Sequence, residues 1–103
     1  MAIAEISIVP IGSPGTSLSE YVAKALSVLK TSGLQFQLTS MGTIIEGDLD
    51  QITRTVRDMH ETAFGNGITR VVTTVKVDDR RDKPNTSEGK VQSVLKKIAK
   101  KGP

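Results

Sequence analysis

The sequence contains no cysteine and no tryptophan, and its only aromatic residues are Tyr21, Phe36 and Phe64. Without cysteine the chain has no disulfide framework, no thiolate zinc site and no cysteine nucleophile, which suits a reducing compartment. Because aromatics are so few, the core must be built from Ile, Val, Leu and Met. A length of 103 residues fits one domain over residues 1–103 and leaves no room for two.

Long hydrophobic runs are also missing, and none approaches the ~18 apolar residues of a membrane span. No basic residue precedes the first apolar stretch, and Glu5 and Pro10 interrupt it, so we expect no signal peptide. We therefore expect a soluble, cytoplasmic protein. The net charge of +3 comes from the lysines near the C-terminus, so the excess of positive charge belongs to one segment and not to the whole surface. These lysines are Lys90, Lys96, Lys97, Lys100 and Lys101.

Hydrophobic periodicity predicts four strands and three helices. The strands are expected over residues 2–9, 34–39, 43–47 and 68–77. A capping box at Ser17–Glu20 opens the first helix and Gly33 ends it, while Asp48 or Asp50 caps the second. The third helix has the apolar stripe Val91, Val94, Leu95 and Ile98.

This order, β-α-β-β-α-β plus a C-terminal helix, predicts an α+β fold with a four-stranded antiparallel sheet. Right-handed crossovers place the two main helices on one face, which is the ferredoxin-like arrangement, and leave the other face bare. Alternation assigns to the bare face Ile3, Glu5, Ser7, Val9, Gln35, Gln37, Thr39, Arg70, Val72, Thr74 and Lys76, and to the helix side Val71, Thr73, Val75 and Val77. The third strand has an ambiguous phase, and we assign Ile44 and Glu46 to the bare face. A surface this mixed is typical of an interface or a ligand site, and paired chains would bury it and enclose polar pockets.

Glu46 is the carboxylate that stands out, because the strand around it is otherwise apolar. A partly buried carboxylate is costly unless it has a partner. One interpretation pairs it with Lys76 or Arg70. The other has it hold a cationic or amino-heterocyclic ligand.

The usual catalytic patterns are missing. His60 is the single histidine, no metal ligands are spaced around it, and a packing or capping role is expected. No glycine elbow surrounds any serine. The loop Pro10–Gly15 has prolines in place of amide donors and no following lysine, so it is interpreted as a connector rather than a phosphate loop.

Two further features are candidate interaction sites. The run Asp78–Lys83 alternates in sign and is either a solvated loop or an inter-subunit charge network. A sheet that binds RNA stacks bases on strand aromatics. Only Phe36 is available here, and we assign it to the core, so we expect no nucleic-acid partner.

Segments over nearly the whole chain resemble the small thiamine-binding protein family, whose members are ferredoxin-like chains of similar length. They are residues 10–12, 17–23, 33–47, 59–61 and 70–83. The specific part combines Met41-Gly42-Thr43 and Glu46-Gly47 with Asp79-Arg80-Arg81-Asp82-Lys83. Ser40 departs from the pattern, which has proline there, and bears on the hairpin turn.

The resemblance implies binding of thiamine or its hydroxymethylpyrimidine part, with no catalysis, no cofactor and no metal. It also implies a homo-oligomer, a tetramer of sheet-paired dimers. From the residues themselves we expect no nucleic-acid or membrane partner. The ligand residues it suggests, together with strand phase, are Ser7, Gln37, Thr39, Thr43 and Glu46 as polar groups, and Met41 and Ile44 as apolar walls. Two alternatives stay open: a structural or regulatory oligomer without a thiamine ligand, and an acylphosphatase-like enzyme, for which the Pro/Gly loop lacks the arginine.

Overall fold

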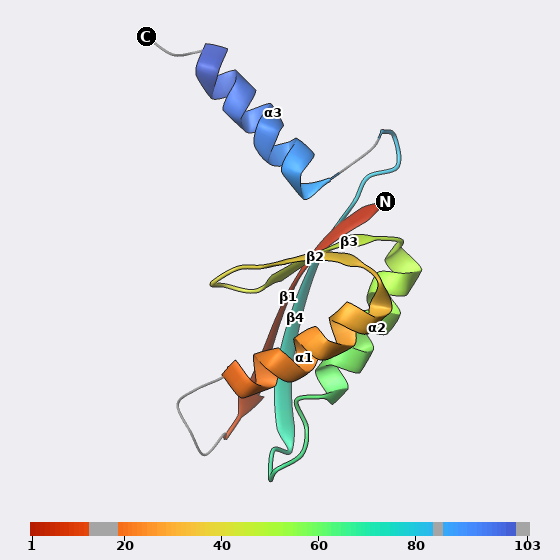
Figure 1. The fold of residues 1–103 in the computed structure, drawn as a ribbon, viewed down its shortest axis with the longest axis vertical. Helices are drawn as coiled ribbons and strands as arrows, with labels where there is room; N and C mark the ends of the chain where they lie inside the picture. Colours follow the sequence, from red (N-terminus) through yellow and green to blue (C-terminus); the bar gives the residue numbers. More distant parts are fainter. Residues whose placement is uncertain (13–18, 84–85, 101–103) are drawn as a thin grey trace.

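The computed structural model describes residues 1–12, 19–83 and 86–100 of the chain. Its elements are β1 (Ala2–Ile11), α1 (Ser19–Ser32), β2 (Gln35–Leu38), β3 (Thr43–Gly47), α2 (Leu49–Glu61), β4 (Arg70–Asp79) and α3 (Ser87–Lys100). The strands form one antiparallel sheet in the order β2-β3-β1-β4. Helices α1 and α2 pack together on one face of it (Figure 1). The predicted α+β ferredoxin-like fold with an added C-terminal helix is confirmed.

The two long strands extend further than predicted. β1 continues through Pro10 and Ile11 because both residues pair with β4. β3 pairs with β1 only as far as Ile6, so the end of β1 has a free edge, and a free edge is where a strand tolerates proline. β4 begins at Arg70, two residues after the predicted start at Ile68, and runs to Asp79, two residues past the predicted end at Val77.

The core lies between the sheet and the two helices. The small side chains of Ala2 and Ala4 are almost fully buried on the central strand, where they let the helices approach closely. Helix α2 packs over them, and its Ile52, Val56 and Met59 are buried. The prediction for Phe36 is wrong: it lies on the edge strand β2 and is 37% exposed, because no further strand lies beside β2.

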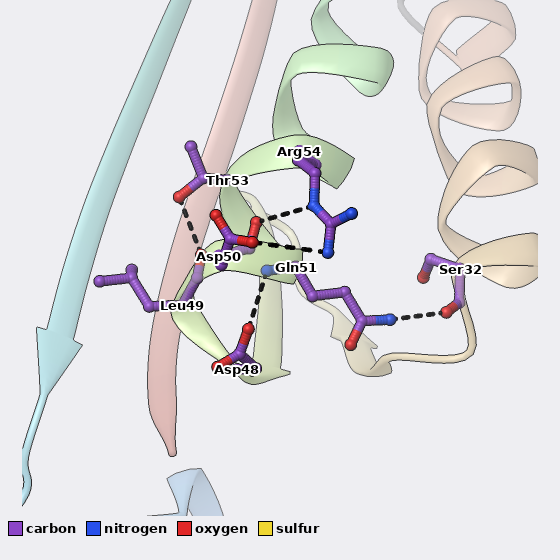
Figure 2. Close-up of polar contacts among 7 residues, drawn as sticks. All are labelled: Ser32, Asp48, Leu49, Asp50, Gln51, Thr53 and Arg54. Atoms are coloured by element: carbon purple, nitrogen blue, oxygen red, sulfur yellow. Dashed lines mark hydrogen bonds and ion pairs between the residues drawn. The ribbon is translucent and has the colours of Figure 1, made fainter.

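The start of α2 is tied to the end of α1 (Figure 2). Of the two candidate caps, Asp48 is the one used, since its Oδ2 accepts from the backbone N–H of Gln51 at 3.2 Å. The Gln51 side chain then donates from Nε2 to the Ser32 carbonyl at 2.9 Å. α1 ends there, and Gly33 follows with φ 78°, a left-handed conformation that favours glycine. Part of the predicted capping box, residues 17 and 18, lies outside the described residues.

Helix α3 projects from one end of the sheet and does not join the core (Figure 1). Its predicted apolar stripe is present but lies in solvent, with Val91, Val94, Leu95 and Ile98 between 50% and 61% exposed. The radius of gyration is 16.1 Å, whereas a compact chain of this length has about 13 Å. The open face of the sheet and the apolar stripe of α3 are therefore both uncovered in the single chain.

Candidate functional site

The open face of the sheet carries the side chains that alternation assigned to it. In the strand register, Glu46 lies between Gln35 of β2 and Ile3 of β1, and Ile3 in turn faces Asp78 of β4. The next row consists of Gln37, Ile44, Glu5 and Lys76. The ambiguous phase of β3 is also settled, because Thr43, Ile45 and Gly47 are buried on the helix side while Ile44 and Glu46 are partly exposed.

Glu46 contacts the first turn of α3. Its Oε1 accepts a hydrogen bond from the backbone N–H of Ser87, one of the amides at a helix start that have no partner within the helix. The predicted pairing with Lys76 or Arg70 is wrong, because in the register Lys76 lies beside Glu5, and Arg70 faces Ile11 at the far end of the sheet. Among the described residues, no hydrogen bond or ion pair reaches the second carboxylate oxygen of Glu46.

A cavity of about 420 Å³ opens at this carboxylate. It combines two side-chain amides and two carboxylates with apolar side chains from β2, β3 and the preceding loop. Its lining residues are Leu34, Gln35, Phe36, Gln37, Ile44, Glu46, Ser87 and Glu88. A pocket of this size, with apolar walls and a few convergent polar groups, is typical of small-molecule sites, and its carboxylates favour a cation.

The other predicted ligand residues lie elsewhere. Ser7, Thr39, Met41 and Thr43 line a separate pocket of about 190 Å³ between β1, α1 and the hairpin turn. The Thr39 hydroxyl is engaged in the turn, where it donates to the Gly42 carbonyl at 2.7 Å and accepts from the Gly42 N–H at 3.1 Å. Met41 is 83% exposed.

The seven predicted residues are thus divided between two places. Gln37, Ile44 and Glu46 line the larger cavity, whereas the remaining four line the hairpin pocket. Thr43 and Ile44 are separated because successive residues of a strand point to opposite faces. No single site gathers all seven.

The sequence predictions missed the contribution of α3 to the larger cavity. Ser87 and Glu88 form part of its wall, and Ser87 is 41 positions away from the carboxylate that it contacts. Thr86 directly precedes the helix, and its Oγ1 accepts from the Gly89 N–H at 2.9 Å. A threonine at this place indicates a helix start, but that signal does not show which part of the sheet the helix would meet.

The charged run after β4 forms ion pairs within the chain. Arg80 and Asp82 make a bidentate pair at 2.6 and 3.0 Å, and Arg81 contacts Asp79 at 2.8 Å. The Arg81 hydrogen bond lowers the pKa of Asp79, and the Arg80 hydrogen bond lowers the pKa of Asp82. Lys90 of α3 pairs with Asp78 of β4. With the Glu46–Ser87 hydrogen bond, this is a second contact that holds the first turns of the helix to the sheet. The inter-subunit role suggested for this run stays a prediction.

His60 makes packing contacts, as its sequence position predicts. Its Nδ1 lies 2.5 Å from the Thr73 hydroxyl of β4, and its ring meets Phe64 edge-on with 5.3 Å between centroids. Among the described residues, no group of three or more His, Cys, Asp or Glu side chains is placed to hold a metal ion. None of the described helices has the length and apolar character needed to cross a membrane.

Comparison with known proteins gives a consistent result. The model of the thiamine-binding protein family matches residues 4–95. The chain is 44% identical over 92 residues to the UPF0045 protein MJ1052 of Methanocaldococcus jannaschii, which covers 89% of this chain and 90% of that protein. It is 41% identical over 102 residues to the UPF0045 protein YqgV of Bacillus subtilis, and the match covers 95% of this chain and 98% of that protein.

Solved structures agree with this relationship. The crystal structure of MJ1052 superposes with a TM-score of 0.82 at 43% identity, over 90% of this chain and 94% of that one. TM0486 of Thermotoga maritima, described as a candidate thiamine biosynthesis or salvage protein, has the same fold, with a TM-score of 0.73 at 22% identity. The match covers 90% of this chain and 97% of that one. The chain therefore belongs to the thiamine-binding protein family.

Proposed function

We propose that the protein binds thiamine, or its hydroxymethylpyrimidine part, and catalyses no reaction. The observation that carries the proposal is Glu46, a carboxylate on the open sheet face with one oxygen unpartnered among the described residues and a cavity of about 420 Å³ beside it. Membership of the thiamine-binding family supports this class of ligand.

The cavity has the groups that such a ligand requires. Thiamine has an aminopyrimidine ring, which donates hydrogen bonds through its amine, and a positively charged thiazolium ring. The free oxygen of Glu46 accepts a hydrogen bond from the amine, and the side-chain amides of Gln35 and Gln37 donate to the ring nitrogens. Ile44 supplies apolar surface for the rings on the open face, and the carboxylates favour the positive charge.

The hairpin pocket is the alternative location for the ligand. It contains Ser7, Thr39, Met41 and Thr43, which stay candidate ligand residues. Its volume of about 190 Å³ is smaller, and pockets for drug-sized ligands usually have roughly 300–1,000 Å³. Ser7→Ala separates the two locations, because it alters the hairpin pocket and leaves the larger cavity unchanged.

We also propose that the protein acts as a homo-oligomer, with sheet-paired dimers forming a tetramer. The support is the apolar surface that the single chain leaves uncovered on its open sheet face, at Val9, Ile11 and Val72, and along α3. Exposed apolar surface of this extent marks interaction sites. A purely structural or regulatory oligomer is the competing function, and it would assemble without binding thiamine.

The test is a thermal-shift and calorimetric titration with thiamine and hydroxymethylpyrimidine, with the thiazole part alone as the control compound. A ligand at ten times its Kd stabilises the native state by about 1.4 kcal/mol, or roughly 6–11 °C for a domain of this size. No stabilisation by either compound would contradict the proposal. Release of phosphate from an acyl phosphate in a parallel assay would instead favour the acylphosphatase-like alternative.

A further inference from the structure

A second hollow lies against the other side of α3 and is lined by positive charge. It is a groove of about 740 Å³ between α3 and the loop that follows β4. Four cationic side chains line it, namely Arg80, Lys83, Lys90 and Lys97, together with the hydroxyl groups of Thr86 and Ser93. Neither the family match nor the proposed thiamine site gives this groove a role.

The groove carries more positive than negative charge. Arg80 is neutralised by its bidentate pair with Asp82, and Lys90 by its pair with Asp78. Neither Lys83 nor Lys97 forms an ion pair in the part of the chain that the structure describes, although the charge of Lys83 helps to lower the pKa of Asp82. Two ammonium groups are therefore available for an anion, beside a guanidinium and a third ammonium group.

The groove adjoins the Glu46 cavity. Lys90 lines both the groove and a hollow of about 250 Å³ between α3 and the open sheet face. That hollow shares Ile44 and Ser87 with the Glu46 cavity. In the strand register Asp78, which holds Lys90, is two strands from Glu46, a separation of about 10 Å from the usual spacing between strands.

We propose that the groove binds the phosphate end of the ligand, so that the protein prefers a phosphorylated form of its aminopyrimidine ligand. This inference rests on the proposed function. The Glu46 cavity offers a carboxylate, and the groove offers ammonium groups. The two together match a molecule with an amine at one end and a phosphate at the other. Several donors around one groove suit the many acceptor oxygens of a phosphate or diphosphate better than a single carboxylate.

The opposite charges also set the orientation of the ligand. The amine faces Glu46 on the sheet, and the phosphate lies toward Lys83 and Lys97 along α3. The reversed orientation would place the phosphate beside two carboxylates, Glu46 and Glu88, which is unfavourable.

The test compares thiamine with thiamine diphosphate by calorimetry on the full chain, at low and at moderate salt. The unmodified protein is expected to bind the diphosphate about 2- to 30-fold more tightly, the range given by two exposed charge pairs. Because exposed charges are screened, the preference shrinks as salt rises. The double variant Lys83→Gln/Lys97→Gln is expected to lose the preference and to keep its affinity for thiamine.

The matched control is Lys24→Gln/Lys30→Gln, which removes the same charge from α1, on the opposite side of the sheet. This control is expected to keep the preference. Equal or weaker binding of the diphosphate by the unmodified protein, with thiamine still bound, overturns the inference alone. A preference that survives Lys83→Gln/Lys97→Gln also overturns it, whereas failure of both compounds to bind overturns the proposed function.

Discussion

Glu46 has two roles in this account, and replacing it tests both. The variant Glu46→Gln keeps the size of the side chain and an acceptor oxygen but removes the charge. A hydrogen bond to a charged group contributes about 1.5–3 kcal/mol and a neutral one about 0.5–1.5 kcal/mol. The difference is about 1–1.5 kcal/mol, so thiamine should bind roughly 5- to 12-fold more weakly.

The same substitution should loosen the start of α3. Glu46 accepts the Ser87 N–H at the helix start, and a negative charge at that place stabilises a helix by about 0.3–1 kcal/mol. Hydrogen exchange of the amides in the first turns of α3 should therefore be roughly 2- to 5-fold faster in Glu46→Gln.

Calorimetry measures the first effect, and hydrogen exchange with mass spectrometry measures the second. Glu61→Gln is the matched control, because it removes the same charge at the end of α2, away from the cavity. A thiamine affinity within twofold of the unmodified protein would remove Glu46 from the ligand site. Unchanged exchange in α3 would refute its role in holding that helix.

Three further predictions concern the core, the assembly and the charged run. Met59→Ala should lower the free energy of unfolding by about 2–5 kcal/mol, because Met59 is 2% exposed. Urea denaturation checks this, with a lower midpoint and an unchanged m-value expected. Val94→Asp/Ile98→Asp should reduce the mass measured by light scattering, and an unchanged mass would show that the apolar stripe of α3 is not part of the interface. Arg80→Gln should raise the pKa of Asp82 toward its ordinary value near 3.8. Because the pKa of Asp82 is lower in the folded state, the ion pair contributes to stability above the ordinary pKa, and this contribution is lost as the pH falls through the folded pKa. An NMR titration that finds the same pKa of Asp82 in Arg80→Gln would contradict the assignment.

The elements of the fold were predictable because their signals are local. Alternation on β1 and β4 gave the correct face for Ser7 and Lys76, and Ile52, Val56 and Met59, which form the buried face of α2, recur at helical spacing. The phase of β3 was ambiguous because Ile44 and Ile45 are adjacent and equally apolar. Alternation puts one on each face, and only the pairing of β3 with β1 shows that Ile45 is the one on the helix side.

The candidate site was predictable only in part. Glu46, Gln37 and Ile44 follow from strand phase and do share a cavity. The contact of Glu46 with Ser87 joins residues 41 positions apart, and no periodic pattern encodes such a contact. The stripe of α3 likewise predicts a helix, but it does not reveal that α3 projects away from the core.

An NMR titration of the labelled protein with thiamine tests the central claim most directly. If the ligand lies beside Glu46, the largest shifts will occur at the amides of Gln35, Gln37 and Ile44 and at the start of α3. Shifts confined to the hairpin pocket, around Thr39 and Met41, or no saturable shifts at all, would contradict the account.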